Sequence, residues 1–325
     1  MLEVIPNVSE GRRPAVVDAL TTAAASTPGA YLLHRDVGRD ANRTVFTIAG
    51  DPPAVTACAK TLAAAAVELI DLRNYTGSHP YVGALDVCPF VALGETPHGA
   101  ALAAAEEVSR FLADELAVPV YAYEHSARRA GLRRLADVRR GGLAGIAARP
   151  AADAPDFGGP LPHPSAGVSV VGARDVLVAY NVNLAGPTGR KAATEAARAV
   201  AREVRAAGGG PHALPGVRAL GWWQGHLGCA QVSCNLTDVE ACGLAEVYEA
   251  VAERARARGC EAAGSELIGL APLSVLAAAG RYYEPAGGSD ARAVAVAAER
   301  LDLGALRPWR ARERVLEWAL ADALS

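Results

Sequence analysis

Hydrophobic and polar positions change their spacing several times along the first half of the chain. Apolar or β-branched runs predict strands, and apolar residues at three- and four-residue spacing predict helices. The predicted strands cover 2–5, 31–33, 44–48, 84–90 and 118–123. The predicted helices cover 13–25, 53–72, 97–116 and 125–136. This succession predicts a first unit that mixes strands with helices.

A stretch rich in proline interrupts the pattern at residues 149–167, which contain five prolines and three glycines. That density predicts a stiff, irregular loop with a domain boundary just beyond it. Further strands are predicted at 168–171, 176–183, 217–223 and 230–236. Further helices are predicted at 188–207, 239–258, 271–280, 289–302 and 311–323. The expected domains are therefore 1–174 and 175–325.

The order of these elements favours the α+β class over a doubly wound sheet, because strands and helices do not strictly alternate. A chain of 325 residues also exceeds what a single core usually supports. We therefore expect two subdomains, each a mixed β-sheet with helices on its outer face.

Charge and hydropathy exclude several partners. The formal net charge is −3 and the arginines are dispersed, which argues against nucleic acid. The pairs Arg128–Arg129 and Arg139–Arg140 are interpreted as solvated faces. No apolar stretch approaches the roughly 18 residues of a membrane span, and the start lacks a basic targeting segment. A cytoplasmic protein without a membrane partner is expected.

Cysteine and histidine spacing gives no sign of a metal. The six cysteines lack CxxC spacing, and the seven histidines form no HxH or HExxH motif. Reduced structural thiols and no metal site are predicted. The chain also lacks a GxSxG elbow, a GxxxxGK[ST] loop and a strand-linked GxGxxG motif, so the site must be built differently.

Polar residues gather instead in predicted turns at strand ends, from which several segments can converge. These residues are Asn7, Glu10, Asp36, Asn42, Arg43, His79 and Asp86. His79 precedes a rigid proline, and imidazole suits proton transfer near neutral pH. The residues alone favour the simpler interpretation of a surface-loop histidine. Asp36 could orient such a histidine or cap a turn.

A series of motifs in order along the chain resembles the formiminotransferase (glutamate formimidoyltransferase) family. Their length makes chance similarity improbable. The stretches are Pro6–Arg12, Asn42–Val45, Gly77–Pro80, Val82–Phe90, Pro155–Gly158, Gly172–Arg174, Asn181–Leu184, Ala230–Ser233 and Gly264–Leu270.

The resemblance implies two subdomains that face each other across a folate-binding tunnel. It places the active-site histidine at His79 and an acidic residue of the same site at Asp36. Substrate contacts are expected from Asn7, Glu10, Asn42 and Arg43. The implied folate loop consists of Gly158, Gly159, Pro160, Leu161, Pro162, His163, Pro164, Ser165, Ala166 and Gly167.

The implied reaction transfers the formimino group of N-formimino-L-glutamate to N5 of tetrahydrofolate, as in histidine degradation. His79 would act as general base and then acid, with Asp36 stabilising its cation. Tetrahydrofolate is the expected co-substrate. A separate cyclodeaminase is expected because the chain ends at Ser325, and the resemblance alone suggests a homodimer.

The neighbours of His79 depart from the family pattern and keep other hypotheses open. Family members usually read Glu–His–Pro–Arg–Met–Gly, whereas this chain reads Ser78–His79–Pro80–Tyr81–Val82–Gly83. Ala166 replaces an aromatic residue of the folate loop, and Asp175 replaces a lysine. One alternative is the same fold with another donor or acceptor, such as formylglutamate, formiminoglycine or a secondary-metabolite amine. Another is a non-catalytic folate-binding or assembly module.

Overall fold

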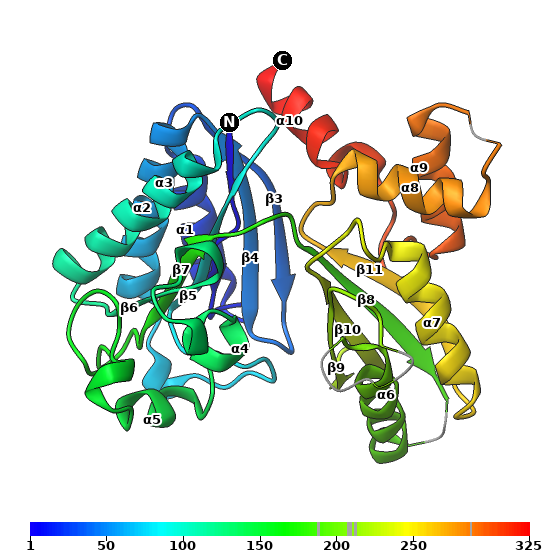
Figure 1. Ribbon diagram of the computed structural model, residues 1–325, viewed down its shortest axis with the longest axis horizontal. Coiled ribbons are helices and arrows are strands. Elements are labelled where there is room, and N and C mark those ends of the chain that lie inside the picture. The colour runs from blue at the N-terminus through cyan, green and yellow to red at the C-terminus, as the bar shows by residue number, and fades with distance from the viewer. Residues whose placement is uncertain (187–188, 207–209, 211–212, 287) are drawn as a thin grey trace. The chain divides into compact units, whose positions relative to one another are not determined.

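The computed structural model describes residues 1–186, 189–206, 210, 213–286 and 288–325, which form two compact units (Figure 1). Met1–Asp175 contains a seven-stranded sheet and Val176–Ser325 a four-stranded sheet. Each unit packs helices on its sheet, as the predicted fold class requires. The first sheet is mixed, as expected. In the second sheet all three strand pairs are antiparallel, whereas a mixed sheet was expected.

The first sheet contains strands from both the start and the middle of the first unit. Its order is β3, β4, then β1 and β2, then β5, β7 and β6, and only the β5–β7 and β6–β7 pairs are parallel. Pro6 separates β1 from β2, which both lie between β4 and β5. The strands are β1 (Leu2–Val4), β2 (Asn7–Val8), β3 (Ala30–Gly38), β4 (Arg43–Gly50), β5 (Leu85–Ala92), β6 (Val120–Ala122) and β7 (Ser169–Ala173).

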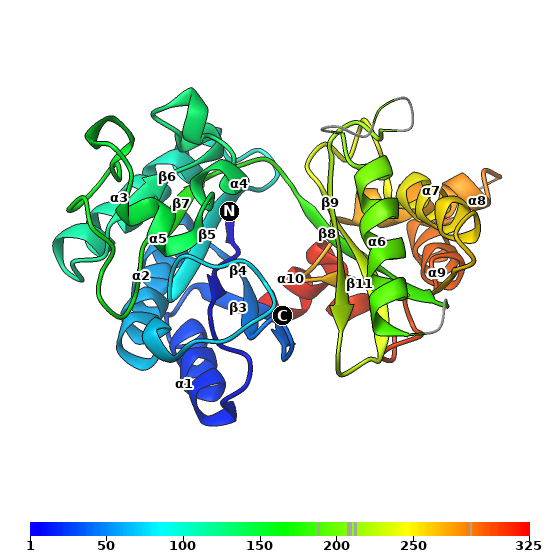
Figure 2. The ribbon, with the colours of Figure 1, turned by 90° about the horizontal axis from the view of Figure 1, so that it is seen from below.

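Three helices cover one face of this sheet, namely α1 (Pro14–Ala25), α2 (Pro52–Leu69) and α3 (His98–Asp114) (Figure 2). Proline at the first turn suits α1 and α2, since it needs no intrahelical donor there. Val55, Leu62 and Ala66 of α2 are fully buried at helical spacing. On the other face, Val87, Tyr121 and Val170 pack against α4 (Leu135–Val138) and α5 (Gly142–Ala147).

The predicted helix over 125–136 is wrong. Only short turns and the four-residue α4 form there, because Ala127, Arg129 and Arg134 adopt extended backbone angles. Long-range contacts override the helical pattern: Arg128 lies 4.2 Å above the Phe157 ring, and Arg129 pairs with Asp156 at 2.9 Å. The short helix α5 was not predicted.

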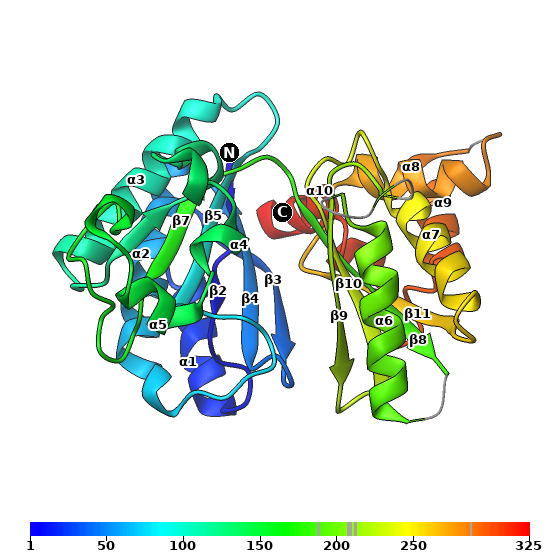
Figure 3. The ribbon, with the colours of Figure 1, turned by 60° about the horizontal axis from the view of Figure 1, so that its bottom comes forward.

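The second sheet has the order β11, β8, β10, β9. Its strands are β8 (Val178–Ala185), β9 (Val217–Gln224), β10 (Cys229–Leu236) and β11 (Glu261–Ile268). Helices α6 (Arg190–Val204) and α7 (Leu244–Arg256) pack on one face of it (Figure 3). They are followed by α8 (Leu273–Tyr283), α9 (Asp290–Arg300) and α10 (Leu316–Leu324).

Strand β11 and helix α7 of the second unit depart from expectation. β11 was missed because Glu261–Ile268 lacks the β-branched run that marks a strand, and a bulge interrupts its pairing between Ala262 and Ser265. Helix α7 starts at Leu244 rather than 239, since Gly243 is extended. The expected ends of the preceding helix, 188 and 207, lie outside the described residues.

Short 3-10 helices complete the described chain at Leu72–Asn74, Glu124–Ser126, Ala130–Leu132, Ala151–Asp153 and Ala311–Glu313. All six cysteines are free thiols, and five of them are buried. None of the helices in the described residues has the length and apolarity needed to cross a membrane.

Candidate active site

A buried carboxylate, Asp86, organises the polar cluster of the first unit. It lies on β5 and is fully buried, and its Oδ2 accepts hydrogen bonds from the guanidinium groups of Arg43 and Arg139. Its Oδ1 accepts the backbone N–H of Val82 at 2.8 Å. Burial opposes ionisation, but the two arginines outweigh it and lower the pKa of Asp86 to about 2. The group is therefore a buried ion triad.

Arg139 is the member of this triad that sequence reasoning missed. We interpreted the Arg139–Arg140 pair as a solvated face, and this is wrong for Arg139. Its side chain is only 13% exposed, whereas that of Arg140 is 78% exposed and pairs with Asp137. No local signal distinguishes the two arginines, because the partner of Arg139 lies on a distant strand.

The turn after β2 is held by Glu10 and Asn42. Oε1 of Glu10 accepts the backbone N–H groups of Gly11, Arg12 and Arg13 at 2.8–3.0 Å. Burial acts against the anion, yet these bonds and the Arg13 guanidinium lower the pKa of Glu10 overall. Oδ1 of Asn42 accepts the N–H of Gly11 at 2.9 Å. Glu10 and Asn42 were predicted to bind substrate. In this structure their side-chain oxygens accept hydrogen bonds from backbone N–H groups of the turn.

The two remaining predicted binding residues belong to the same cluster. Nε of Arg43 donates to Oδ1 of Asn7 at 3.1 Å, while its Nη1 donates to Oδ2 of Asp86. Nδ2 of Asn7 donates to the carbonyl of Ile5 at 2.7 Å. Asn7 therefore fixes the orientation of the arginine that stands between it and Asp86.

The loop that carries His79 is tied to the turn between β3 and β4. Nδ2 of Asn42 donates to the carbonyl of Thr76 at 3.0 Å, and Oγ of Ser78 donates to that of Asp40 at 3.0 Å. The hydroxyl of Tyr75 lies 2.6 Å from the carbonyl oxygen of Asn42. Because these bonds act just before His79, they restrict where its side chain can lie.

His79 itself is half-buried and its tautomer is determined by its contact. Nδ1 lies 2.7 Å from the carbonyl oxygen of Pro80, which can only accept, so Nδ1 carries the proton and Nε2 the lone pair. Burial, followed by the positive charges of Arg43 and Arg139, lowers the pKa of His79 to about 3, although Asp86 acts in the opposite sense. The imidazole is therefore neutral at physiological pH.

The residues that depart from the family pattern have partners in the first unit. The rings of Tyr81 and Tyr75 are tilted by 60° with centroids 4.2 Å apart. Val82 is fully buried, and Ser78 binds the Asp40 carbonyl. Tyr81 thus places an aromatic surface where the family usually carries a charged arginine.

The sequence context of Asp36 suggested a turn. In the structure Asp36 lies within β3. It is buried, and its Oδ2 lies 3.2 Å from Nε2 of His34. The charges that act most strongly on His79 are Arg43, Arg139 and Asp86. The role of Asp36 toward His79 stays a prediction.

The segment Gly158–Gly167 is irregular, as expected, and its two halves differ. Gly158–Leu161 is exposed, and Leu161 is 65% accessible. In the second half, Nδ1 of His163 accepts the N–H of Ala166 at 3.0 Å, and the backbones of His163 and Gly167 exchange two hydrogen bonds. The second half is thus a closed turn.

This turn is attached directly to the segment between His79 and β5. Ala84 donates to the carbonyl of Ala166 at 2.9 Å, and Val168 donates to that of Val82 at 2.8 Å. Gly167 has φ +71°, and a Cβ there would overlap the Val82 carbonyl oxygen. The predicted folate loop and the predicted catalytic loop therefore meet within one unit.

Family models match both parts of the chain. The model described as "Formiminotransferase domain, N-terminal subdomain" matches residues 1–174, and "Formiminotransferase domain" matches residues 179–321. The chain belongs to the formiminotransferase family.

Relatives of known name agree with this family assignment. The chain is 38% identical to a glutamate formimidoyltransferase of Streptococcus pyogenes, over 87% of this chain and 93% of that protein. It is 33% identical to a protein of the same name from Thermoplasma acidophilum, over 89% and 94%. The formimidoyltransferase-cyclodeaminase of Sus scrofa is 37% identical over 99% of this chain and 60% of its own length. This formiminotransferase chain thus spans about 60% of that longer relative.

Proposed function

We propose that the chain transfers the formimino group of N-formimino-L-glutamate to N5 of tetrahydrofolate, giving 5-formimidoyltetrahydrofolate and L-glutamate. The observation that carries the proposal is His79, a neutral imidazole whose proton is fixed on Nδ1 by Pro80. Two relatives that share most of their length with the chain bear the name glutamate formimidoyltransferase.

His79 performs the proton transfers in this account. Its Nε2 removes the proton from N5 as N5 bonds to the amidine carbon, which becomes tetrahedral. The imidazolium then gives that proton to the glutamate nitrogen, and the bond between carbon and this nitrogen breaks. An imidazolium with a low pKa releases its proton readily, which favours departure of an amine that leaves poorly when unprotonated.

The charges around His79 suit such a short-lived cation. Arg43 and Arg139 disfavour imidazolium in the free protein, and Asp86 favours it. A donor that brings a carboxylate toward these arginines raises the pKa of His79 at the moment of transfer. Asp36 remains our candidate for an additional stabilising carboxylate.

The loop Gly158–Gly167 fits the folate proposed as co-substrate. Its exposed first half presents Leu161 and glycine backbone, surfaces on which an aromatic ring can pack. Its second half is already closed by hydrogen bonds, so binding orders little additional chain. We place the reaction in the cytoplasm, and a separate cyclodeaminase stays a prediction.

A second candidate function keeps this chemistry and changes the donor. The Tyr75–Tyr81 ring pair next to His79 favours a less anionic donor than formiminoglutamate, since it offers no charge to a second carboxylate. Formiminoglycine, which has a single carboxylate, is the simplest such donor.

The two candidates are separated by a spectroscopic assay of the purified chain with tetrahydrofolate. Formiminoglutamate, formylglutamate and formiminoglycine are supplied in parallel, and kcat/KM is measured for each. The leading proposal expects the highest kcat/KM with formiminoglutamate. A preference for another donor supports the second candidate, and no folate product with any donor contradicts both.

A further inference from the structure

The polar cluster around Asp86 has a net positive charge. Arg43 and Arg139 are both largely buried, with side chains 9% and 13% exposed, and in the described part of the chain both form ion pairs with this one carboxylate. His79 is neutral and adds no charge of either sign. One of the two buried cations is therefore not compensated. A buried charge without a counter-charge costs free energy, which an anionic ligand recovers.

Arg139, rather than Arg43, has donors left for such a ligand. Arg43 uses Nε for Asn7 and Nη1 for Asp86. Arg139 uses Nη2 for Asp86, and its buried Nε makes no hydrogen bond. Nη1 of Arg139 has no acceptor among the described residues either. Burial is the main cause that lowers the pKa of Arg139, with Arg43 acting in the same sense and Asp86 against both.

The backbone just before Arg139 is held in place. Nη2 of Arg149 donates to the carbonyls of Asp137 and Val138, at 3.1 and 2.6 Å. These bonds fix the end of α4, from which the Arg139 side chain extends, and Asp86 fixes its guanidinium. Because both ends of the side chain are already ordered, a ligand that binds it loses little affinity to conformational entropy.

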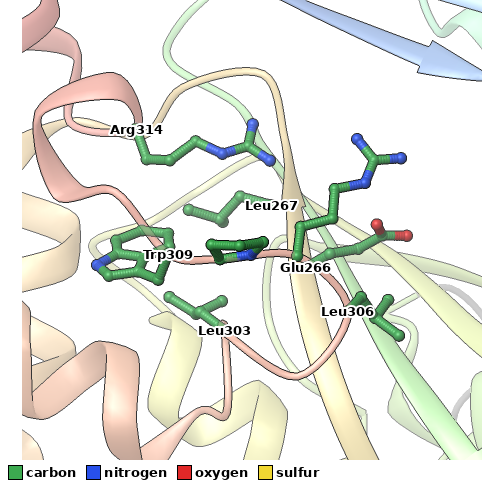
Figure 4. Close-up of a pocket in the computed structure, with 8 residues that line it drawn as sticks. Glu266, Leu267, Leu303, Leu306, Trp309 and Arg314 are labelled. Atoms are coloured by element: carbon green, nitrogen blue, oxygen red, sulfur yellow. The ribbon is translucent and has the colours of Figure 1, made fainter.

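The arginine that lines the pocket of the second unit is a contrasting case. Figure 4 shows Arg314 extending over Leu267, with the Glu266 carboxylate on the same pocket. Nη1 of Arg314 donates to the carbonyl of Gly269 at 3.0 Å. This pocket therefore presents an acidic group together with its cation, whereas two nitrogens of Arg139 have no acceptor. An anionic ligand is favoured at Arg139.

The available nitrogens of Arg139 belong to the same cluster as the proposed catalytic residue. Oδ1 of Asp86 accepts the N–H of Val82, which follows His79 by three residues. Oδ2 of the same carboxylate accepts from Arg139. The positive charge of Arg139 is close enough to lower the pKa of His79. Tyr81 offers no charge to an anion, so an anion that approaches the imidazole meets the donors of Arg139.

We propose that Nη1 of Arg139 binds the α-carboxylate of the formimino donor, the carboxylate on the carbon that carries the leaving nitrogen. This assignment rests on the proposed function, which supplies the donor. One carbon separates the α-carboxylate from the nitrogen that receives the proton of His79, whereas three carbons separate the γ-carboxylate of glutamate from it. The nearer group therefore lies at Arg139 when the nitrogen is at His79. Formiminoglutamate and formiminoglycine both carry it, so Arg139 selects donors derived from α-amino acids.

Calorimetric titration of the full chain in the absence of folate measures donor binding without turnover. The first ligand is N-formimino-L-glutamate. The second is N-formimino-L-2-aminobutyrate, which keeps only the α-carboxylate, and the third is N-formimino-4-aminobutyrate, which keeps only the distant one. Wild type should bind the second ligand at least tenfold more tightly than the third. This comparison needs no variant to fold.

Variants of Arg139 separate a direct contact from a structural role. Arg139→Gln should weaken binding of the two ligands with an α-carboxylate about tenfold or more and leave the third within twofold. Arg139→Lys keeps the charge and should bind these two more tightly than Arg139→Gln does. Arg140→Gln, at the exposed neighbour, should stay within twofold of wild type for all three. A merely structural role of Arg139 would weaken all three ligands alike.

The outcomes also distinguish this inference from the proposed function. Unchanged affinities in Arg139→Gln, equal weakening of all three ligands, or a wild type that binds no donor or prefers N-formimino-4-aminobutyrate overturns the inference. Binding with the expected preference but without formation of a folate product contradicts only the proposed function. Transfer by Arg139→Gln with the wild-type KM for N-formimino-L-glutamate contradicts only this inference.

Discussion

Arg139 and Arg43 donate to the same oxygen, Oδ2 of Asp86, although one follows α4 and the other starts β4. Both charges also act on the imidazole of His79. A single carboxylate therefore holds together the arginines that set the protonation of the proposed catalytic residue. Stability and chemistry are coupled at this point, and each can be tested separately.

The first prediction concerns Asp86→Asn. The change leaves two guanidinium groups without a buried counter-charge, which should reduce the free energy of unfolding by about 3–5 kcal/mol. Urea denaturation measures it. Asp71→Asn is the matched control, because the Asp71–Arg73 pair is exposed and its loss should not move the midpoint. Equal midpoints for both variants would contradict the buried triad.

Acid should remove the contribution of Asp86. Its folded pKa is about 2, below the usual value near 3.8, so its stabilisation is present above pH 4 and is lost as the pH falls toward 2. Unfolding midpoints measured from pH 5 to pH 2 should fall steeply in wild type and less in Asp86→Asn. Parallel curves for the two proteins would refute this assignment.

The pH dependence of the reaction should reflect a neutral His79. With a pKa near 3, the free protein keeps this base unprotonated, so kcat/KM should show no decline at pH 6.5 attributable to His79. Arg139→Gln removes one positive charge and should move the acidic limb toward higher pH. Arg140→Gln, at an exposed neighbour, should leave it in place. An acidic limb near 6.5 in wild type would be inconsistent with the cluster.

The contact between the two loops can be tested at glycine. Gly167→Ala forces a side chain onto a backbone of φ +71° and into the Val82 carbonyl, which should cost about 2 kcal/mol or more. Gly159→Ala, in the same loop with open space around it, should have little effect. Thermal unfolding compares the two. We also expect a raised KM for tetrahydrofolate in Gly167→Ala only.

The sequence predicts most elements of the first unit because apolar spacing is a local property. It also singles out Asn42, Arg43, His79 and Asp86, since polar residues at strand ends converge in many folds. The structure brings Arg43, His79 and Asp86 into one electrostatic cluster. Their roles as binding or catalytic residues stay predictions.

Other features depend on partners far along the chain and leave no local signal. Arg139 resembles Arg140 until β5 supplies Asp86. The turns around Arg128 and Arg129 replace a predicted helix because Phe157 and Asp156 attract these side chains. Strand β11 forms without strand-like residues because β8 offers it an edge.

The central claim is that His79 carries the proton between the two nitrogens. The decisive measurement follows the carbon of N-[13C]formimino-L-glutamate by NMR in the presence of tetrahydrofolate. Wild type and His98→Ala, at an exposed histidine of α3, should form 5-[13C]formimidoyltetrahydrofolate at similar rates. His79→Ala should be slower by about 10²–10⁴-fold. Undiminished transfer by His79→Ala would contradict the account.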